Sequence, residues 1–330
     1  MAAVIYAETG STDPAFNLAF EEFILTGKSA GDYLMLWQNE NTVVVGRNQL
    51  SAAEIDESFV RSHGITVVRR MTGGGAVYHD LGNLNYSFIT DLGNAEELSI
   101  EKFARPVCAA LEKLGVKAEL SGRNDILAEG KKVSGVAQRI YKGRILHHGT
   151  LLFDSSPDMI AGALRADPEK FRAKSASSVR SRVGNIRQLL PVDMSIDQFW
   201  QAILRELSGE GFVRFEPTAA ELREIERLAE EKYRSWDWNF GQSPRYGFEN
   251  SLRFPGGRLH VSMDVEKGII KRIAFSGDYM ALSDDTGVLE ALIGLPHERS
   301  AIEQALNELG EELRLSFGSI SAGEIASAMF

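Results

Sequence analysis

The pattern of apolar and polar positions alternates between helix-like and strand-like segments along the chain. Asp13 and Pro14 suit the N-cap and first position of a helix, and the apolar residues that follow recur at helical spacing until Gly27. A second helical pattern covers residues 99–114 and contains Pro106. The strands expected between these helices are Tyr33–Trp37, Thr42–Val45, 65–70, 76–79 and 84–90.

The second half of the chain predicts further strands and then helices. Lys142-Gly143 reads as the turn of a hairpin, and Ser195 and Thr218 each begin a capping box at the start of an amphipathic helix. The segment 236–251 reads as a linker, followed by strands and one helix at about 300–313. Paired strands without a βαβ rhythm indicate an α+β fold. The additional strands expected are 116–120, 125–128, 132–141 and 144–153.

Composition and charge exclude several classes of protein. The chain has 330 residues, 44% of them hydrophobic, which is too apolar for a disordered chain and long enough for two domains. A net charge of −10 disfavours a general nucleic-acid binder. No segment reads as a signal peptide or a membrane span, and a single cysteine suits a reducing cytoplasm.

The familiar nucleotide and hydrolase motifs are missing from the sequence. The glycine run at 73–75 lies between two strand patterns, so it is not the G-x-G-x-x-G of a dinucleotide site, and Glu22 breaks the only Walker A resemblance. There is no H-E-x-x-H, no G-x-S-x-G and no metal-ligand spacing among the six histidines.

Four other stretches carry candidate chemistry. Arg69 and Arg70 precede the glycine run, whose bare backbone could hold an anion, although a tight turn with solvated arginines is the alternative. Lys131 and Lys132 alternate on a strand, so at most one faces a pocket. His147-His148 lies in a strand pattern. The segment 165–187 carries seven Lys+Arg and two Asp+Glu, which suits either a solvated loop or a mobile anion-binding flap.

In this order, these stretches resemble the lipoate–protein ligase A family over most of the chain. The matching motifs include Asn17-Leu-Ala-x-Glu-Glu22, Thr42-Val-Val-Val-Gly-Arg47, the Arg-Arg-x-x-Gly-Gly-Gly run to Asn83, Lys132-Val-Ser-Gly135 and His147-His-Gly-Thr-Leu-Leu152. Val136 departs from the small or polar residue usual in the family. The resemblance implies a biotin/lipoate ligase-like catalytic fold of mixed sheets and packed helices at residues 1–244, and a small α+β accessory domain at 245–330.

The resemblance also implies a two-step reaction. Lipoate, and octanoate as a second substrate, would react with ATP and Mg²⁺ to give an acyl-AMP and pyrophosphate, and the acyl group would pass to a lysine of an acceptor. Lys132 would be the catalytic residue, Asp125 would bind Mg²⁺, and the 174–187 loop would close over the intermediate. The implied nucleotide contacts are Arg70, Gly74, Gly75, Ala76, Val77, Tyr78, Asn83, Asp125, Lys132, Gly149, Thr150, Arg180 and Arg182. The implied lipoate contacts are Arg69, Gly74, His79, Lys132, Ser134, Gly135 and His148.

Related transferases of this fold work without ATP through a catalytic cysteine. The only thiol here is Cys108, at helical spacing among apolar residues, which favours a core position and the ATP-dependent route. A catalytically decayed protein that only binds lipoyl domains is a second alternative, and the intact Arg70, glycine run and Lys132 disfavour it.

The implied partners are lipoyl domains of 2-oxoacid dehydrogenase E2 subunits and the glycine cleavage H-protein, met by a monomeric enzyme. Such acceptors are acidic, so a chain of charge −10 needs a locally positive docking surface. The residues expected to contribute to it are Arg47, Arg139, Arg144, Arg180 and Arg182.

Overall fold

The computed structural model describes residues 4–92, 100–122, 124–165, 183–209, 211–242, 246–279, 281 and 283–330. Its contacts divide the chain into two compact units, one of residues 1–49 and 54–235, the other of residues 50–53 and 236–330. The division therefore falls after Ser235, and four residues from early in the chain group with the second unit.

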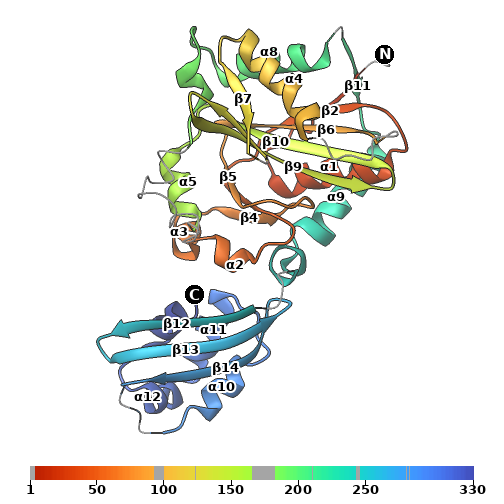
Figure 1. Ribbon diagram of the computed structural model, residues 1–330. Helices are drawn as coiled ribbons and strands as arrows, with labels where there is room; N and C mark the ends of the chain where they lie inside the picture. Colours follow the sequence, from red (N-terminus) through yellow and green to blue (C-terminus); the bar gives the residue numbers. More distant parts are fainter. Residues whose placement is uncertain are drawn as a thin grey trace. The chain divides into compact units, whose positions relative to one another are not determined.

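An eight-stranded mixed sheet organises the first unit (Figure 1). Its strand order is β11-β1-β2-β6-β10-β9-β8-β7; β1 is parallel to β11 and β2, and the other neighbours are antiparallel. A smaller sheet has the order β4-β3-β5. The strands are β1 (Val4–Ala7), β2 (Tyr33–Trp37), β3 (Thr42–Val45), β4 (Thr66–Arg69), β5 (Val77–His79), β6 (Asn83–Asp91), β7 (Ala118–Ser121), β8 (Asp125–Ala128), β9 (Lys131–Tyr141), β10 (Arg144–Leu152) and β11 (Phe212–Phe215).

Helices cover both faces of the large sheet. Helices α4 and α8 pack on one face, and α1 lies on the other, between the large sheet and the small one (Figure 1). The helices from this part of the chain are α1 (Pro14–Gly27), α2 (Ser51–Glu54), α3 (Glu57–Ser62), α4 (Ile100–Lys113), α5 (Pro157–Ala163), α8 (Ile196–Ser208) and α9 (Ala219–Leu228), with shorter turns η1 (Ile186–Leu189) and η2 (Ala229–Tyr233).

The expected helix starts are confirmed by their side-chain hydrogen bonds. Asp13 accepts from the backbone N–H of Ala15, and Pro14 opens α1. Ser195 and Thr218 both form reciprocal capping boxes, at α8 and α9. Each such cap satisfies backbone N–H groups that the helix cannot pair itself, at a worth of about 1 kcal/mol.

The register of the central strands gives the large sheet two different faces. Trp37 on β2 pairs with Asn85 on β6, and Asn85 also pairs with Thr150 on β10. Two residues further along β6, Ser87 pairs with His148. Because side chains alternate, these polar residues share the face toward α1. The residues between them, including Leu36, Tyr86 and Val136, belong to the hydrophobic core with α4 and α8. One face therefore builds the core, and the other is available for a site.

The second unit is an antiparallel sheet, β12-β13-β14, with helices packed on one face. Its apolar core contains Val261, Val265, Leu306 and Phe317. The elements are η3 (Asp237–Gly241), β12 (Tyr246–Phe254), β13 (Gly257–Glu266), β14 (Ile269–Gly277), α10 (Thr286–Leu292), α11 (Arg299–Glu308), α12 (Glu311–Phe317) and α13 (Ala322–Ala328).

Two predictions for this half of the chain were wrong. The expected linker at 236–251 contains the helical turn η3 and most of strand β12. The single helix expected at 300–313 is two helices, because Gly310 adopts a left-handed φ of 52° and ends one helix before the next begins. In the first unit the expected strands are confirmed to within two residues, whereas β1, β11, α3 and α5 were not predicted. Helix α2, most of which groups with the second unit, was not predicted either.

Candidate active site

A pocket opens on the α1 side of the large sheet, between that sheet and the small one. It encloses about 580 Å³ of empty space when its open mouth is included. One part of its wall is apolar, with Leu18, Trp37 and Val44, and another is polar, with Asn124, Lys132 and Thr150. The full lining is Leu18, Trp37, Val44, Arg70, Gly75, Ala76, Val77, His79, Asn85, Asn124, Lys132, Gly135, Val136, Ala137, His148, Gly149 and Thr150.

Most of the residues expected at the site meet in this pocket. Those that line it are Arg70, Gly75, Ala76, Val77, His79, Lys132, Gly135, His148, Gly149 and Thr150. Those that do not are Arg69, Gly74, Tyr78, Asn83, Asp125 and Ser134. Arg180, Arg182 and most of the 174–187 loop lie outside the described residues.

The guanidinium groups of the two consecutive arginines donate to backbone carbonyls, and they do not face a ligand together. Arg69 is fully buried, and its Nη1 lies 2.7–3.0 Å from the carbonyl oxygens of Gly46, Arg47 and Gln49. This placement does not support the expected lipoate contact of Arg69. Arg70 donates from Nη2 to the carbonyls of Gly73 and Gly75, from Nη1 to that of Val44, and from Nε to the Thr72 hydroxyl.

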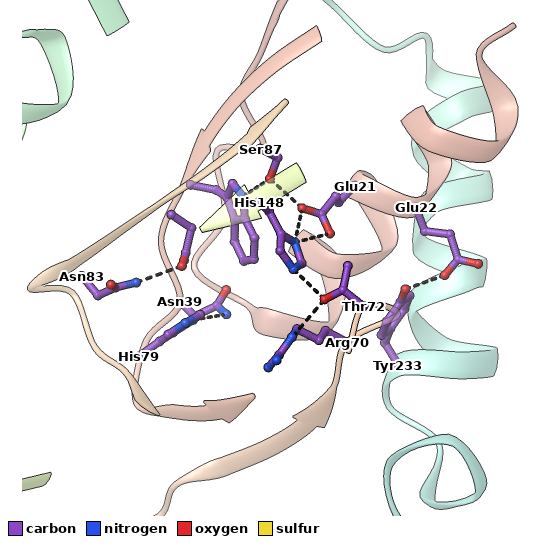
Figure 2. Close-up of polar contacts among 12 residues, drawn as sticks. Glu21, Glu22, Asn39, Arg70, Thr72, His79, Asn83, Ser87, His148 and Tyr233 are labelled. Atoms are coloured by element: carbon purple, nitrogen blue, oxygen red, sulfur yellow. Dashed lines mark hydrogen bonds and ion pairs between the residues drawn. The ribbon is translucent and has the colours of Figure 1, made fainter. Parts of the chain in front are cut away.

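A chain of buried polar groups connects Arg70 to helix α1 (Figure 2). His148 Nε2 lies 2.7 Å from Thr72 Oγ1, and its Nδ1 lies 2.9 and 3.1 Å from the two carboxylate oxygens of Glu21. Glu21 also accepts a hydrogen bond from Ser87 at 2.6 Å, and Ser87 accepts one from the Trp37 indole. Both nitrogens of His148 are therefore occupied, and its ring borders the pocket.

His79 is held as a neutral ring by a second chain of side chains. Asn17 donates to Asn39 Oδ1 at 2.9 Å, which turns the Asn39 amide so that its Nδ2 meets His79 Nδ1 at 3.2 Å. The proton of the neutral ring is thereby placed on Nε2, which is buried without a partner among the described residues. Burial lowers the pKa of His79 to about 3, so the ring stays neutral at physiological pH.

Lys132 provides the ammonium at the polar end of the pocket. Its Nζ lies 2.7 Å from Asp125 Oδ1, and both side chains are about one-third exposed, which leaves the pair open to a ligand. Lys131, the adjacent residue, is exposed and does not line the pocket, as alternation predicts. Gly135 donates its N–H to Thr150 Oγ1 at 3.1 Å, which joins β9 and β10 beside this lysine.

Five residues in or next to the pocket were not predicted as site residues. Trp37, Asn85 and Asn124 line it, whereas Glu21 and Thr72 contact the lining residue His148. Their positions depend on the strand register and on contacts between distant parts of the chain, which the sequence alone does not reveal. Val136, the departure from the family pattern, is almost fully buried in the core and also borders the pocket.

The expected docking arginines have different surroundings. Arg144 is buried, and its guanidinium donates to the carbonyls of Lys28 and Gly31, so the prediction that it forms part of a docking surface was wrong. Arg139 is half-buried and donates to the Met71 carbonyl, whereas Arg47 is exposed.

His147 lies on the core face of β10, opposite His148. It is fully buried, its ring stacks on Phe103 with centroids 5.0 Å apart, and its Nδ1 lies 2.9 Å from Gln138 Nε2. Burial lowers its pKa to about 3. This histidine is a neutral core residue and contributes nothing to the pocket.

We expect His147 to make the fold sensitive to acid. An unfolded histidine has a pKa of about 6.5, so between pH 6.5 and about 3 only the unfolded state binds the proton. The stability is complete above pH 6.5 and is lost as the pH falls through this window. His147→Phe keeps a stacking ring and should reduce the loss of unfolding free energy between pH 7 and pH 5 by about 1–2 kcal/mol. Urea unfolding at both pH values measures this, and an unchanged pH dependence would contradict it.

Within the described part of the chain, no cluster of three or more His, Cys, Asp or Glu side chains could hold a metal ion by itself. The helices of the same residues are all too short or too polar to cross a bilayer.

Comparison with known proteins identifies the family of both parts of the chain. The sequence model of the family "Lipoyl protein ligase A/B catalytic domain" matches residues 13–208, and that of "Bacterial lipoate protein ligase C-terminus" matches residues 243–329. Lipoate–protein ligase 1 of Staphylococcus aureus is 40% identical over 96% of this chain and 97% of its own.

Solved structures agree with the sequence matches. The bipartite lipoate protein ligase of Thermoplasma acidophilum, described with its E2 lipoyl domain, superposes with a TM-score of 0.63 at 30% identity, over 73% of this chain and 98% of its own. A crystal structure of lipoate-protein ligase A bound with ATP gives 0.61 at 30% identity, over the same shares. The expected α+β ligase fold is confirmed, and the chain belongs to the lipoate–protein ligase family.

Proposed function

We propose that the pocket of the first unit activates lipoate with ATP and then transfers the lipoyl group to a lysine of an acceptor protein. One observation carries the proposal: an apolar recess and a polar end with a lysine meet in one pocket beside the glycine loop, residues 73–75. The ATP-dependent ligase activity of the family requires such a pairing, because it joins an apolar acyl chain to a nucleotide phosphate.

In the first step a lipoate carboxylate oxygen attacks the α-phosphorus of ATP. The bond between the α-phosphorus and the bridging oxygen breaks, and pyrophosphate leaves. In the second step the acceptor amine attacks the acyl carbon, AMP leaves with its phosphate oxygen, and the amine loses a proton. No covalent bond to the enzyme is needed, so the pocket acts by position and charge.

The lining suggests how lipoate and the nucleotide share the pocket. Leu18, Trp37 and Val44 would enclose the apolar acyl chain, together with the ring of His148. The backbone of residues 75–77 and the polar groups of Gly149 and Thr150 would contact the adenylate. Lys132 would then stand near both the carboxylate and the α-phosphate, where its ammonium stabilises the negative charge of the transition state.

Asp125 would serve the magnesium that accompanies ATP. Its carboxylate lies 2.7 Å from Lys132 Nζ and is about one-third exposed, so it would remain accessible to a cation. Mg²⁺ usually binds proteins through one or two carboxylates and completes its shell with substrate phosphates and water, so a single acidic residue fits this ion. The ion would supply charge neutralisation for the phosphates of ATP.

The cysteine-dependent route of related transferases is disfavoured by the position of Cys108. This thiol lies on α4, packs against the hydrophobic core of the first unit and is not among the pocket residues. Burial also raises its pKa, which reduces the fraction of nucleophilic thiolate.

Cys108→Ser is therefore expected to retain lipoyl transfer within about twofold of wild type, with only a small loss of stability. Incorporation of lipoate into the acceptor lysine can be followed by mass spectrometry. A variant that folds but no longer transfers would favour a thioester intermediate and contradict the ATP-dependent route.

The acceptors proposed are lipoyl domains of 2-oxoacid dehydrogenase E2 subunits and the glycine cleavage H-protein. The archaeal relative is described together with an E2 lipoyl domain, which supports the first class. A monomer acting in the cytoplasm is proposed as well, and the single cysteine suits a reducing compartment.

Lipoate-dependent exchange of labelled pyrophosphate into ATP tests the proposed function directly. Wild-type protein should exchange label only when lipoate is present, and octanoate should be tried as a second acid. Absence of exchange, combined with transfer from an octanoyl carrier protein, would overturn the ligase proposal.

A further inference from the structure

We propose that Glu21 and Thr72 are positioning residues of the adenylation step, because they hold Arg70 and, through it, the glycine loop. The proposal rests on the proposed function and adds two residues that do not line the pocket themselves. Both are buried, and they belong to parts of the chain 51 positions apart, α1 and the loop after β4.

We call the chain of side chains Arg70, Thr72, His148 and Glu21 the relay (Figure 2). One placement of its hydrogens gives every donor an acceptor. Arg70 has no acceptor, so its Nε–H donates to Thr72 Oγ1 at 3.0 Å, and the Thr72 hydroxyl hydrogen is left for His148 Nε2 at 2.7 Å. His148 then carries its proton on Nδ1 and donates it to Glu21. The His148 ring and the Thr72 hydroxyl thus connect the buried carboxylate of Glu21 to the buried guanidinium of Arg70.

Arg70, held by the relay, in turn binds the backbone of the glycine loop. Its Nη2 lies 2.6 Å from the carbonyl oxygen of Gly73 and 2.8 Å from that of Gly75. In a planar trans peptide the C=O and the following N–H point in opposite directions, so the N–H groups of Gly74 and Ala76 are directed away from Arg70. Backbone N–H groups arranged in this way form an anion site, which the triphosphate of ATP would use.

The relay also has an electrostatic consequence. Burial lowers the pKa of Arg70 to about 10, with the charge of Glu21 acting in the opposite direction. Arg70 remains charged at neutral pH, and Glu21 is the carboxylate that balances it. Removing the Thr72 hydroxyl would leave the Nε–H of Arg70 and the Nε2 of His148 buried without their present partners, which is costly in a low-dielectric interior.

Thr72→Val removes the hydroxyl at nearly constant volume and is the decisive variant. We expect its KM for ATP in the exchange reaction to rise about 10- to 100-fold, while Thr72→Ser, which keeps a hydroxyl, stays within about threefold of wild type. Glu21→Gln, which keeps the shape but loses the charge, should lie between them. The matched controls are Thr26→Val and Glu22→Gln, both on α1, the helix that carries Glu21. In wild type the Thr26 hydroxyl donates to the Glu22 carbonyl, and the Glu22 carboxylate accepts from Lys232 and Tyr233.

Amide hydrogen exchange of the peptide covering residues 70–78 provides a readout that a merely structural role would not move. In Thr72→Val this peptide should exchange at least about fivefold faster than in wild type, while β6 and β10 remain protected. Equal KM for ATP and equal amide exchange in wild type and Thr72→Val would overturn the proposal, and so would an equal loss in Thr72→Ser. If the wild type shows no pyrophosphate exchange, the proposed function fails, and the amide exchange still decides whether the relay orders the loop.

Discussion

Lys132→Ala is expected to lower the rate of lipoate-dependent pyrophosphate exchange by about 10²- to 10³-fold, which corresponds to about 3–4 kcal/mol of transition-state stabilisation. The ammonium lies at the polar end of the pocket, 2.7 Å from Asp125 and open to a ligand. During adenylation the carboxylate and the α-phosphate approach each other with like charge, and this is the only lysine among the described lining residues. The only arginine among the described lining residues is Arg70, whose guanidinium donates to backbone carbonyls.

Lys131→Ala is the matched control for this prediction. The two lysines are neighbours on β9, but Lys131 is exposed and lies outside the pocket lining. Its loss should leave exchange within about twofold of wild type. Stability should change little in either variant, because an ion pair between partly exposed side chains contributes about 1 kcal/mol or less. Equal exchange rates in Lys132→Ala and wild type would remove Lys132 from the chemistry.

Local structure was predictable where a few neighbouring residues determine it. The N-cap of α1 at Asp13, the capping boxes at Ser195 and Thr218, and the hairpin at Lys142-Gly143 all depend on contacts within a few positions. Such signals can be read from one sequence because the donor, the acceptor and the turn residue lie side by side in the chain.

The second unit shows where this reading failed. In β12, Phe248, Leu252 and Phe254 pack against the apolar core, whereas Glu249, Ser251 and Arg253 are exposed. Glycines, a proline and polar residues made the segment 236–251 look like a linker, although pairing with β13 over nine residues outweighs those weak local preferences. A helix-like pattern likewise continued across Gly310, whose left-handed φ of 52° separates α11 from α12.

The candidate site was predictable as a set of residues and less so as a set of contacts. Ten residues expected from the motifs line the pocket. The two arginines were expected to bind anions because arginine forks suit phosphates and carboxylates. Their guanidinium groups instead meet backbone carbonyls from residues 44–49 and 73–75, and no local pattern could reveal these distant acceptors. Glu21 and His148 are 127 positions apart, so their pairing likewise depends on the assembled sheet.

Gly46→Ala is expected to be the most damaging single-methyl change near the site, although Gly46 does not line the pocket. A Cβ at this position would lie 2.1 Å from the carbonyl oxygen of Gly74, well inside any real contact distance. Neither Gly46 nor the glycine loop can move easily to relieve this contact. The Gly46 carbonyl is held by the buried Arg69, and the carbonyls on both sides of Gly74 are held by Arg70. Overpacking of this kind costs about 1–3 kcal/mol of stability.

If the fold survives Gly46→Ala, the displaced part must be the glycine loop, and the KM for ATP should rise about 10²-fold while binding of lipoate changes far less. Gly73→Ala is the control within the loop, because a Cβ there meets no atom within 4 Å and the backbone is not left-handed. Urea unfolding separates a loss of fold from a loss of site. A Gly46→Ala protein with wild-type KM for ATP would show that the loop does not need this close approach, and that the nucleotide is held by other groups. A Gly46→Ala variant that loses only ATP binding would place the nucleotide at the glycine loop, although the substitution changes no residue that touches the nucleotide.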